Sequence, residues 1–186
     1  TFAQTLRSME NLITLLIGSA SIAAVLWVFF PERGLLAQWR YARKVTNKTR
    51  REDAIKHIFD CEISGRRTSL HSLAGALHIS VDDAHTLISE LDERGLVDFE
   101  AELPVLTPSG RDLALHLLRA HRLWERYLAD ATGFAETEWH VQADRLEHML
   151  THEELEQLSA RLSHPVYDPH GDPIPTADGE MGEVAG

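Results

Sequence analysis

Thiols and catalytic motifs are almost missing from this chain of 186 residues. Cys61 is its single cysteine, which excludes an internal disulfide and a cluster of thiolate ligands and fits a reducing compartment. The simplest role for Cys61 is that of a small buried hydrophobic residue. The sequence also lacks a glycine-rich phosphate loop, internal repeats, and a nucleophile, histidine and acid at supporting spacing. These absences argue against an enzyme.

Positive charge is scarce, and much of it lies at one end of the chain. Lys and Arg number 18 against 29 Asp and Glu, which gives a net charge of −11. Residues 52–186 hold ten basic residues against 27 acids, a net charge of −17. Because an acidic body repels phosphate backbones, nucleic-acid binding by residues 52–186 is disfavoured. The first residue is Thr1, which fits a fragment or a processed form.

Charged residues are absent from one long apolar run, Leu12 to Phe30, which reads LITLLIGSASIAAVLWVFF. As a helix this run would cover roughly 28 Å, close to the hydrocarbon core of about 30 Å. Trp27 lies near one end, where an aromatic belt is expected, and Gly18 begins a patch of small residues that suits close helix packing. The length of the run and the lack of a small-residue cleavage site make a secretory signal a poor alternative. We therefore expect a transmembrane helix, with a buried helix of a soluble domain as the alternative.

A basic segment without acids follows the apolar run. Its charges are Arg33, Arg40, Arg43, Lys44, Lys48, Arg50 and Arg51. By the positive-inside rule, these charges predict a chain in the cell (inner) membrane with its C-terminal body in the cytoplasm. Nucleic-acid contact is the alternative role of the segment, but its place beside the apolar run favours lipid headgroups.

Residues 52–110 have the pattern of a winged helix. Ser80 is a suitable N-cap for the third helix, whose buried face is formed by apolar residues at helical spacing, and Gly95 ends that helix. A hairpin follows and turns into the next helix at residues 107–110. The expected helices are one with apolar spacing over 53–59 that ends before Ser64-Gly65, then 70–77 and 81–94, and the expected strands are 96–100 and 104–106. Helix, helix–turn–helix and hairpin is the order of a winged helix.

The recognition helix of this unit has the wrong charge for DNA. Readout of bases and phosphates requires Arg, Lys, Asn or Gln near the N-terminus of that helix, where Asp82 and Asp83 stand instead. The helix also carries Glu90, Asp92 and Glu93 against the single Arg94, and the hairpin adds Asp98, Glu100 and Glu102. We expect a winged helix that has lost its DNA-binding face.

Histidines and carboxylates concentrate in one stretch of the C-terminal body. Six of them suit a single site: His121, Glu125, His140, Asp144, Glu147 and His148. The last four share one helical face, and the first two form an i,i+4 pair on an upstream helix that ends at Thr132-Gly133. Three imidazoles and three carboxylates on two facing helices suit a divalent transition metal of intermediate hardness. A solvated face is the ordinary role of any one such residue, but six at this spacing favour a metal site.

The C-terminal body contains four distinctive blocks in order: GLVDFEAELPVLTPSGRDLA, HRLWERYLADATG, WHVQADRLEH and HPVYDPHGDPIP. These blocks resemble the diphtheria-toxin-repressor/MntR family of metal-dependent regulators, and the resemblance covers residues 52–175. It implies a winged helix followed by a helical dimerisation domain, a homodimer formed through those helices, and metal held between the two parts.

The resemblance also implies two sets of metal ligands. The first set is His121, Glu125 and His140, and the second is Asp53, Asp144, Glu147 and His148. Carboxylates at Asp53 and Asp144, where iron-sensing members often have Met and Cys, resemble the manganese-sensing branch and favour Mn(II) or Fe(II), with Zn(II) as the alternative. Lys56 stands where manganese members tend to carry a second carboxylate, which argues against a two-ion manganese site. An acid at a helix N-terminus is the alternative role of Asp53.

A second resemblance covers the first part of the chain. The apolar run followed by FFPERGLLAQWR looks like the last helix and tail of a metal ABC-transporter permease of the manganese/zinc/iron type. Together the two resemblances imply a metal-sensing domain on a divalent-metal permease, with ABC transporter subunits as partners. The alternatives are a metal-dependent DNA-binding repressor of metal uptake genes and a dimerisation module with vestigial metal sites.

The expected fold is mainly α. Its parts are a transmembrane helix with flanks over 1–33, a basic connector over 34–51, a winged helix-turn-helix with a small β-hairpin over 52–110, metal-binding and dimerisation helices over 111–175, and an acidic tail over 176–186. Thr151 opens a capping box for a helix to about Leu162. Beyond that helix, four polar residues lie among prolines, where a structured turn is favoured over weak metal ligation: His164, Asp168, His170 and Asp172.

Overall fold

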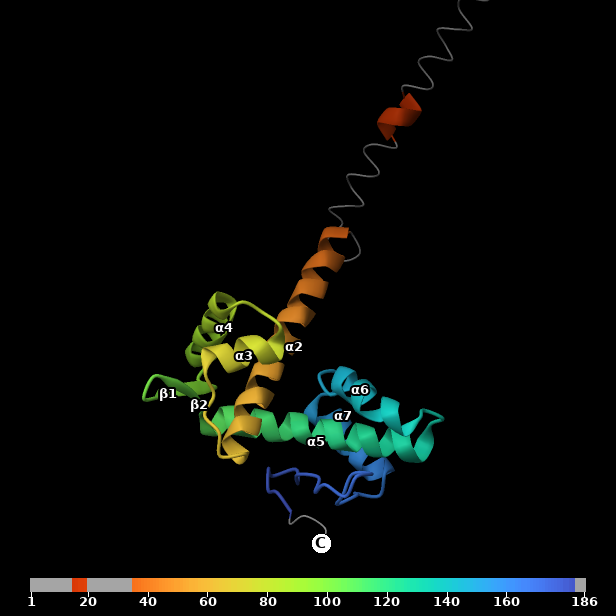
Figure 1. Ribbon diagram of the computed structural model, residues 1–186. Helices are drawn as coiled ribbons and strands as arrows, with labels where there is room; N and C mark the ends of the chain where they lie inside the picture. The colour runs from red at the N-terminus through yellow and green to blue at the C-terminus, as the bar shows by residue number, and fades with distance from the viewer. Residues whose placement is uncertain (1–14, 20–34, 183–186) are drawn as a thin grey trace, which may run out of the picture. The chain divides into compact units, whose positions relative to one another are not determined.

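The computed structural model describes residues 15–19 and 35–182 (Figure 1). The chain divides into two units, Thr1–Lys48 and Thr49–Gly186. Residues 15–19 form a short helical segment. Most of the transmembrane helix predicted over Leu12 to Phe30 lies outside the described residues. Within residues 15–19 and 35–182, no helix combines the length and the apolar character that crossing a membrane requires.

Helix α2 spans Leu35–Ile63 and is longer than the sequence pattern predicts. The helical spacing over residues 53–59 lies in its C-terminal part, and α2 ends before Ser64-Gly65 as predicted, but it begins well before residue 53. The sequence contains neither Gly nor Pro between Leu35 and Ile63, so the backbone meets no residue that would interrupt a helix. The expected start of the winged unit, at residue 52, therefore falls within a continuous helix. Four residues of α2 form part of the buried core of the C-terminal unit: Ala54, Ile55, Ile58 and Phe59.

The winged helix is formed by two short helices and a hairpin. Helix α3 spans Leu70–Leu77, α4 spans Val81–Glu93, and strands β1 (Val97–Glu100) and β2 (Leu103–Leu106) pair antiparallel. The Ser80 side chain accepts a hydrogen bond from the Asp83 N–H at 3.0 Å, as an N-cap should. The buried residues of α4 are Ala84, Leu87, Ile88 and Leu91. Both the element order and the buried face of α4 confirm the winged-helix prediction.

Helix α5 connects the winged helix to the helical region. It spans Pro108–Ala131 and is capped by Thr107. Helix α6 spans Glu136–Leu146 and α7 spans His152–Arg161. Figure 1 shows α5 (green) running from the β1–β2 hairpin to α6 and α7. Its first half contributes Ala114 and Leu115 to the core shared with α2, α3 and α4, whereas its second half contributes Ala120 and Leu123 to a smaller core with α7.

The segment after α7 folds into a turn, as the prolines predict. Tyr167 pairs with Pro173 in an isolated β-bridge. The buried carboxylate of Asp168 accepts hydrogen bonds from the N–H groups of His170 and Asp172, at 2.8 and 2.9 Å. Because its Oδ1 accepts both backbone hydrogen bonds, Asp168 stabilises this turn, and that oxygen is not available to a metal ion.

Candidate metal centre

His121 and Glu125 lie one turn apart on the buried side of α5. His121 is 6% exposed and Glu125 is 3% exposed, although both side chains are polar. The amphipathic pattern that buries Leu117, Ala120 and Leu123 carries these two residues inward as well. Buried polar groups of this kind require hydrogen-bonding or metal partners. Those partners come from α6 and from Glu147 at its C-cap.

The first predicted ligand set forms a compact triangle of donor atoms. His121 Nε2 lies 3.1 Å from Glu125 Oε1 and 3.0 Å from His140 Nδ1, and that Nδ1 lies 3.2 Å from Glu125 Oε1. Two ligands bonded to one ion at about 2.1 Å and at right angles to each other lie about 3 Å apart. The three atoms therefore fit a divalent ion where they stand. The His140 side chain is 68% exposed, so the triangle is open to solvent on that side.

A second group joins α2 to the end of α6. His148 Nε2 lies 3.2 Å from Asp53 Oδ1 and 3.6 Å from Glu147 Oε1. The other ring nitrogen, Nδ1, lies 2.8 Å from Glu52 Oε2. Glu52 thereby orients the ring so that Nε2 faces the two candidate ligands, a role that outer-shell carboxylates commonly have in metal sites.

Asp144 falls into a third group. His121 Nδ1 lies 2.7 Å from Glu147 Oε2 and 3.3 Å from Asp144 Oδ1. The family resemblance groups Asp144 with Asp53 and His148, whereas in the structure Asp144 lies with His121 and Glu147. His121 and Glu147 each belong to two groups, so the three groups form one connected centre.

Helix α6 ends earlier than the helical pattern predicts. Its last residue is Leu146, Glu147 is the C-cap and His148 lies in the turn that follows. Glu147 and His148 still reach the centre, because the first residues beyond the helix keep a helix-like backbone at Glu147 (φ −58°, ψ −30°).

Mutual hydrogen bonding sets the charge state of the centre without metal. Burial opposes a charge on His121, but hydrogen bonds to Asp144, Glu125 and Glu147 outweigh burial and raise its pKa to about 10. Burial likewise opposes a charge on His148, whose pKa is raised to about 9 by Asp53 and Glu52. Hydrogen bonding to His121 keeps the pKa of Asp144 well below its usual range. In the metal-free chain, protons on these two histidines compensate the carboxylates.

The metal-free chain is expected to lose stability as the pH rises from 6.5 towards 10. The folded-state pKa values of His121 and His148, about 10 and about 9, lie above the ordinary value of 6.5. Their contribution is therefore complete below pH 6.5 and is lost as the pH passes through about 9 and about 10. Urea denaturation across this range measures the effect. A free energy of unfolding that is constant or rises would contradict it.

Excess Mn²⁺ provides the control for this pH series. Metal ligation requires a deprotonated ring nitrogen, so protons compete with the ion and its affinity increases with pH. Stabilisation by Mn²⁺ is therefore expected to grow over the same range in which the metal-free chain weakens.

Two residues near the centre were not identified as ligands from the sequence. Glu52 supports His148. Its position in the sequence, directly before Asp53 and one helical turn before Lys56, is the signal that could have identified it. Lys56 lies on α2 with its Nζ 2.6 Å from Glu147 Oε1. Burial lowers the pKa of Lys56, but the charges of Glu147 and Asp144 outweigh burial and raise it.

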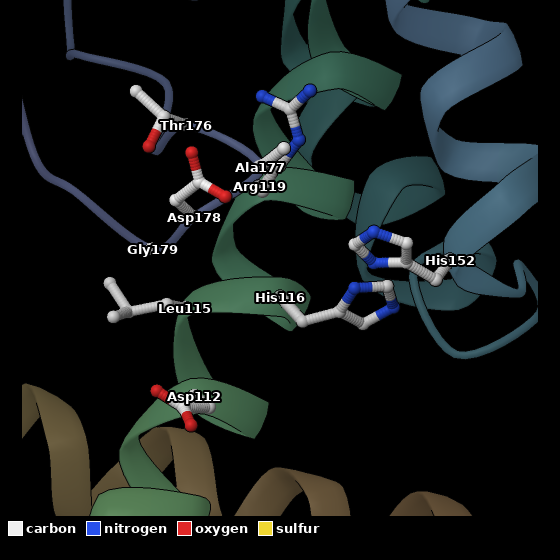
Figure 2. Close-up of a pocket in the computed structure, with 9 residues that line it drawn as sticks. All are labelled: Asp112, Leu115, His116, Arg119, His152, Thr176, Ala177, Asp178 and Gly179. Carbon is white, nitrogen blue, oxygen red and sulfur yellow. The ribbon is translucent and has the colours of Figure 1, made fainter.

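A separate cavity of about 320 Å³ lies between α5, α7 and the segment beyond Pro175 (Figure 2). Its wall includes His116 and His152, whose rings stack with centroids 5.8 Å apart. Arg119 also lines it, but this guanidinium already donates to Glu156 and to the Pro175 carbonyl. Within the described part of the chain, sets of three converging metal donors occur only at the centre around His121 and Glu147.

Several known proteins are similar to this chain. Residues 107–176 match the family model described as "Iron dependent repressor, metal binding and dimerisation domain". The "Iron-dependent repressor IdeR" of Mycobacterium tuberculosis is 32% identical over 122 residues, which are 65% of this chain and 53% of that protein. A "Probable metal transport system membrane protein" of Chlamydia trachomatis is 44% identical over 85 residues, 46% of this chain and 19% of that protein.

Solved structures are also similar to this chain. The structure titled "Manganese-dependent transcriptional repressor complex with manganese" superposes with a TM-score of 0.66 at 37% identity, over 72% of this chain and 62% of that one. "Crystal Structure of ScaR with bound Zn2+" gives a TM-score of 0.64 at 27% identity, over 72% and 63%. The chain thus spans about half the length of the iron-dependent repressors it matches and about a fifth of the Chlamydia membrane protein.

Proposed function

We propose that this chain is a divalent-metal-sensing regulatory domain of the iron dependent repressor family, whose model matches residues 107–176, as the sequence blocks predict. The observation that carries the proposal is the convergence of all seven predicted ligands in three connected groups. Carboxylate oxygens and imidazole nitrogens, without thiolate, suit Mn(II) and Fe(II), with Zn(II) as a third candidate. The family description also supports a homodimer formed through the helical region.

The ligands connect the winged helix to the helical region. Asp53 and Glu52 lie on α2, next to residues of the winged-helix core, whereas His148 and Glu147 follow α6. A bound divalent ion would supply positive charge to the connected centre in which these carboxylates lie. A sensor requires two arrangements of the protein that differ in metal affinity, and the relative orientation of α2 and α6 is the candidate for that difference.

We further propose that this domain forms the cytoplasmic end of a membrane-bound metal transporter. The apolar run over residues 12–30 and the basic residues after it favour this reading. The Chlamydia relatives named as metal transport system membrane proteins, 44% and 43% identical, also favour it. In addition, the acids of the recognition helix are exposed in the folded unit, where they would repel DNA: Asp82, Asp83, Glu90, Asp92 and Glu93.

A metal-dependent DNA-binding repressor is the second candidate. The winged helix and the relatives named as repressors favour it. DNA contact would then have to come from few cations, because Arg94 is the single basic residue of α4 and its cap. Arg66 and Arg67 are the nearest basic pair in sequence.

Two experiments separate the candidates. Removing residues 52–186 from the full transporter should abolish inhibition of uptake by intracellular metal, whereas unchanged inhibition would contradict the transporter role. A gel shift of the chain with duplex DNA, at low salt and with Mn²⁺, tests the repressor role, because non-specific binding is strongest at low salt. We expect no shift, and a metal-dependent shift that weakens with salt would favour the repressor.

A further inference from the structure

Lys56 places an ammonium group among the ligands that would otherwise hold a second ion. Its Nζ lies 2.6 Å from Glu147 Oε1 and 3.4 Å from Asp144 Oδ1. The Glu147 side chain is fully buried and that of Lys56 is 24% exposed. Salt and water therefore screen the pair of Lys56 and Glu147 less than a surface ion pair.

The two carboxylate oxygens of Glu147 face different cations. Oε2 accepts a hydrogen bond from His121 Nδ1 at 2.7 Å, on the side of the triangle formed with Glu125 and His140. Oε1 accepts from Lys56 and faces His148, whose Nε2 lies 3.6 Å away. Lys56 thus contacts the oxygen by which Glu147 would join His148 and Asp53 around an ion.

An ammonium group and a divalent ion are incompatible at this position. Charged lysine has three N–H donors and no lone pair, so Lys56 cannot serve as a ligand in that form. A divalent ion bound to Glu147 Oε1 would also lie close to the ammonium, where repulsion is strong because solvent access is limited. Asp144 Oδ1, the other oxygen near Nζ, is engaged in the same way.

We propose that the Lys56 ammonium replaces a second metal ion, so that each protomer binds one divalent ion, held by His121, Glu125 and His140. This inference rests on the proposed function, because it specifies how the metal centre is occupied. The triangle is the group whose three donor atoms lie 3.0–3.2 Å apart. Lys56 also ties α2 to Glu147 whether or not metal is present, so part of the contact between α2 and the end of α6 is independent of metal.

Metal stoichiometry of the full chain tests the inference. Equilibrium dialysis against Mn²⁺, with metal analysis, should give one equivalent per protomer for the natural chain and two for Lys56→Glu. Electron paramagnetic resonance gives a second readout, because two neighbouring Mn²⁺ ions couple and broaden each other's signal. Lys56→Gln removes the charge but adds no carboxylate, so its second equivalent should bind more weakly than that of Lys56→Glu. If only one of the two Lys56 variants folds, its metal stoichiometry alone still tests the inference.

Arg67→Glu is the matched control. It changes the net charge by the same amount at an exposed position outside the three donor groups, and it should keep one equivalent. Two equivalents in the natural chain, or one in both folded Lys56 variants, would overturn the inference while leaving a metal sensor intact. No saturable Mn²⁺ binding in any variant would overturn the proposed function as well.

Discussion

His121→Ala is expected to lower metal affinity by at least about 100-fold. Loss of an outer-shell partner alone commonly costs about 10- to 100-fold, and His121 is a direct member of two donor groups. Its Nε2 faces Glu125 and His140, and its Nδ1 faces Glu147. Removing the ring therefore breaks the triangle and also leaves a fully buried carboxylate without one of its partners. Equilibrium dialysis against Mn²⁺ measures the loss.

His116→Ala is the control on the same helix. Its imidazole stacks on His152 and belongs to none of the three donor groups, so metal affinity should stay within about twofold. If His121→Ala bound Mn²⁺ as tightly as the natural chain, the centre around His121 would be vestigial. The helical region would then serve for dimerisation alone.

Gly110→Ala is expected to destabilise the fold by about 3 kcal/mol. A Cβ at Gly110 would lie 1.9 Å from the backbone oxygen of Leu96 and 3.3 Å from Leu106 Cδ2. Because the first clash is with backbone, the hairpin and the first turn of α5 must move apart. That movement would also disturb the hydrogen bond from the Thr107 N–H to the Leu96 oxygen, which is 3.2 Å long. Urea denaturation measures the change in free energy.

Gly75→Ala separates steric clash from the general effect of adding a methyl group. Gly75 lies within α3, and a Cβ there would meet nothing within 4 Å. Alanine is favoured over glycine in a helix by about 1 kcal/mol, so this variant should be as stable as the natural chain or slightly more so. Equal stability of Gly110→Ala and Gly75→Ala would show that α5 does not depend on close contact with Leu96.

Local signals in the sequence predicted the winged helix well. Ser80 of the winged helix and Thr151 before α7 were predicted as N-caps, and each side-chain oxygen accepts a hydrogen bond from the N–H three positions on, because capping depends on nearby residues. The buried face of α4 follows its apolar period for the same reason. The change in charge near residue 52 suggested a boundary there, whereas the sequence contains no helix breaker and α2 continues through it.

The candidate site was predicted in membership, and in arrangement except for the place of Asp144. All seven residues lie in the centre, yet Asp144 groups with His121, because which ligands share an ion depends on how α2, α5 and α6 pack. The pair of Lys56 and Glu147 joins positions 91 residues apart, and no local spacing encodes such a contact. The support that Glu52 gives to His148, across 96 residues, was missed for the same reason.

Calorimetric titration of the full chain with Mn²⁺, Fe²⁺ and Zn²⁺ tests the central claim most directly. We expect saturable binding of one ion per protomer, accompanied by release of protons, because hydrogen bonds to three carboxylates raise the pKa of His121 in the metal-free chain to about 10. Repeating the titration in buffers of different ionisation enthalpy counts those protons. Absence of saturable binding for all three metals would contradict the assignment of this chain as a metal sensor.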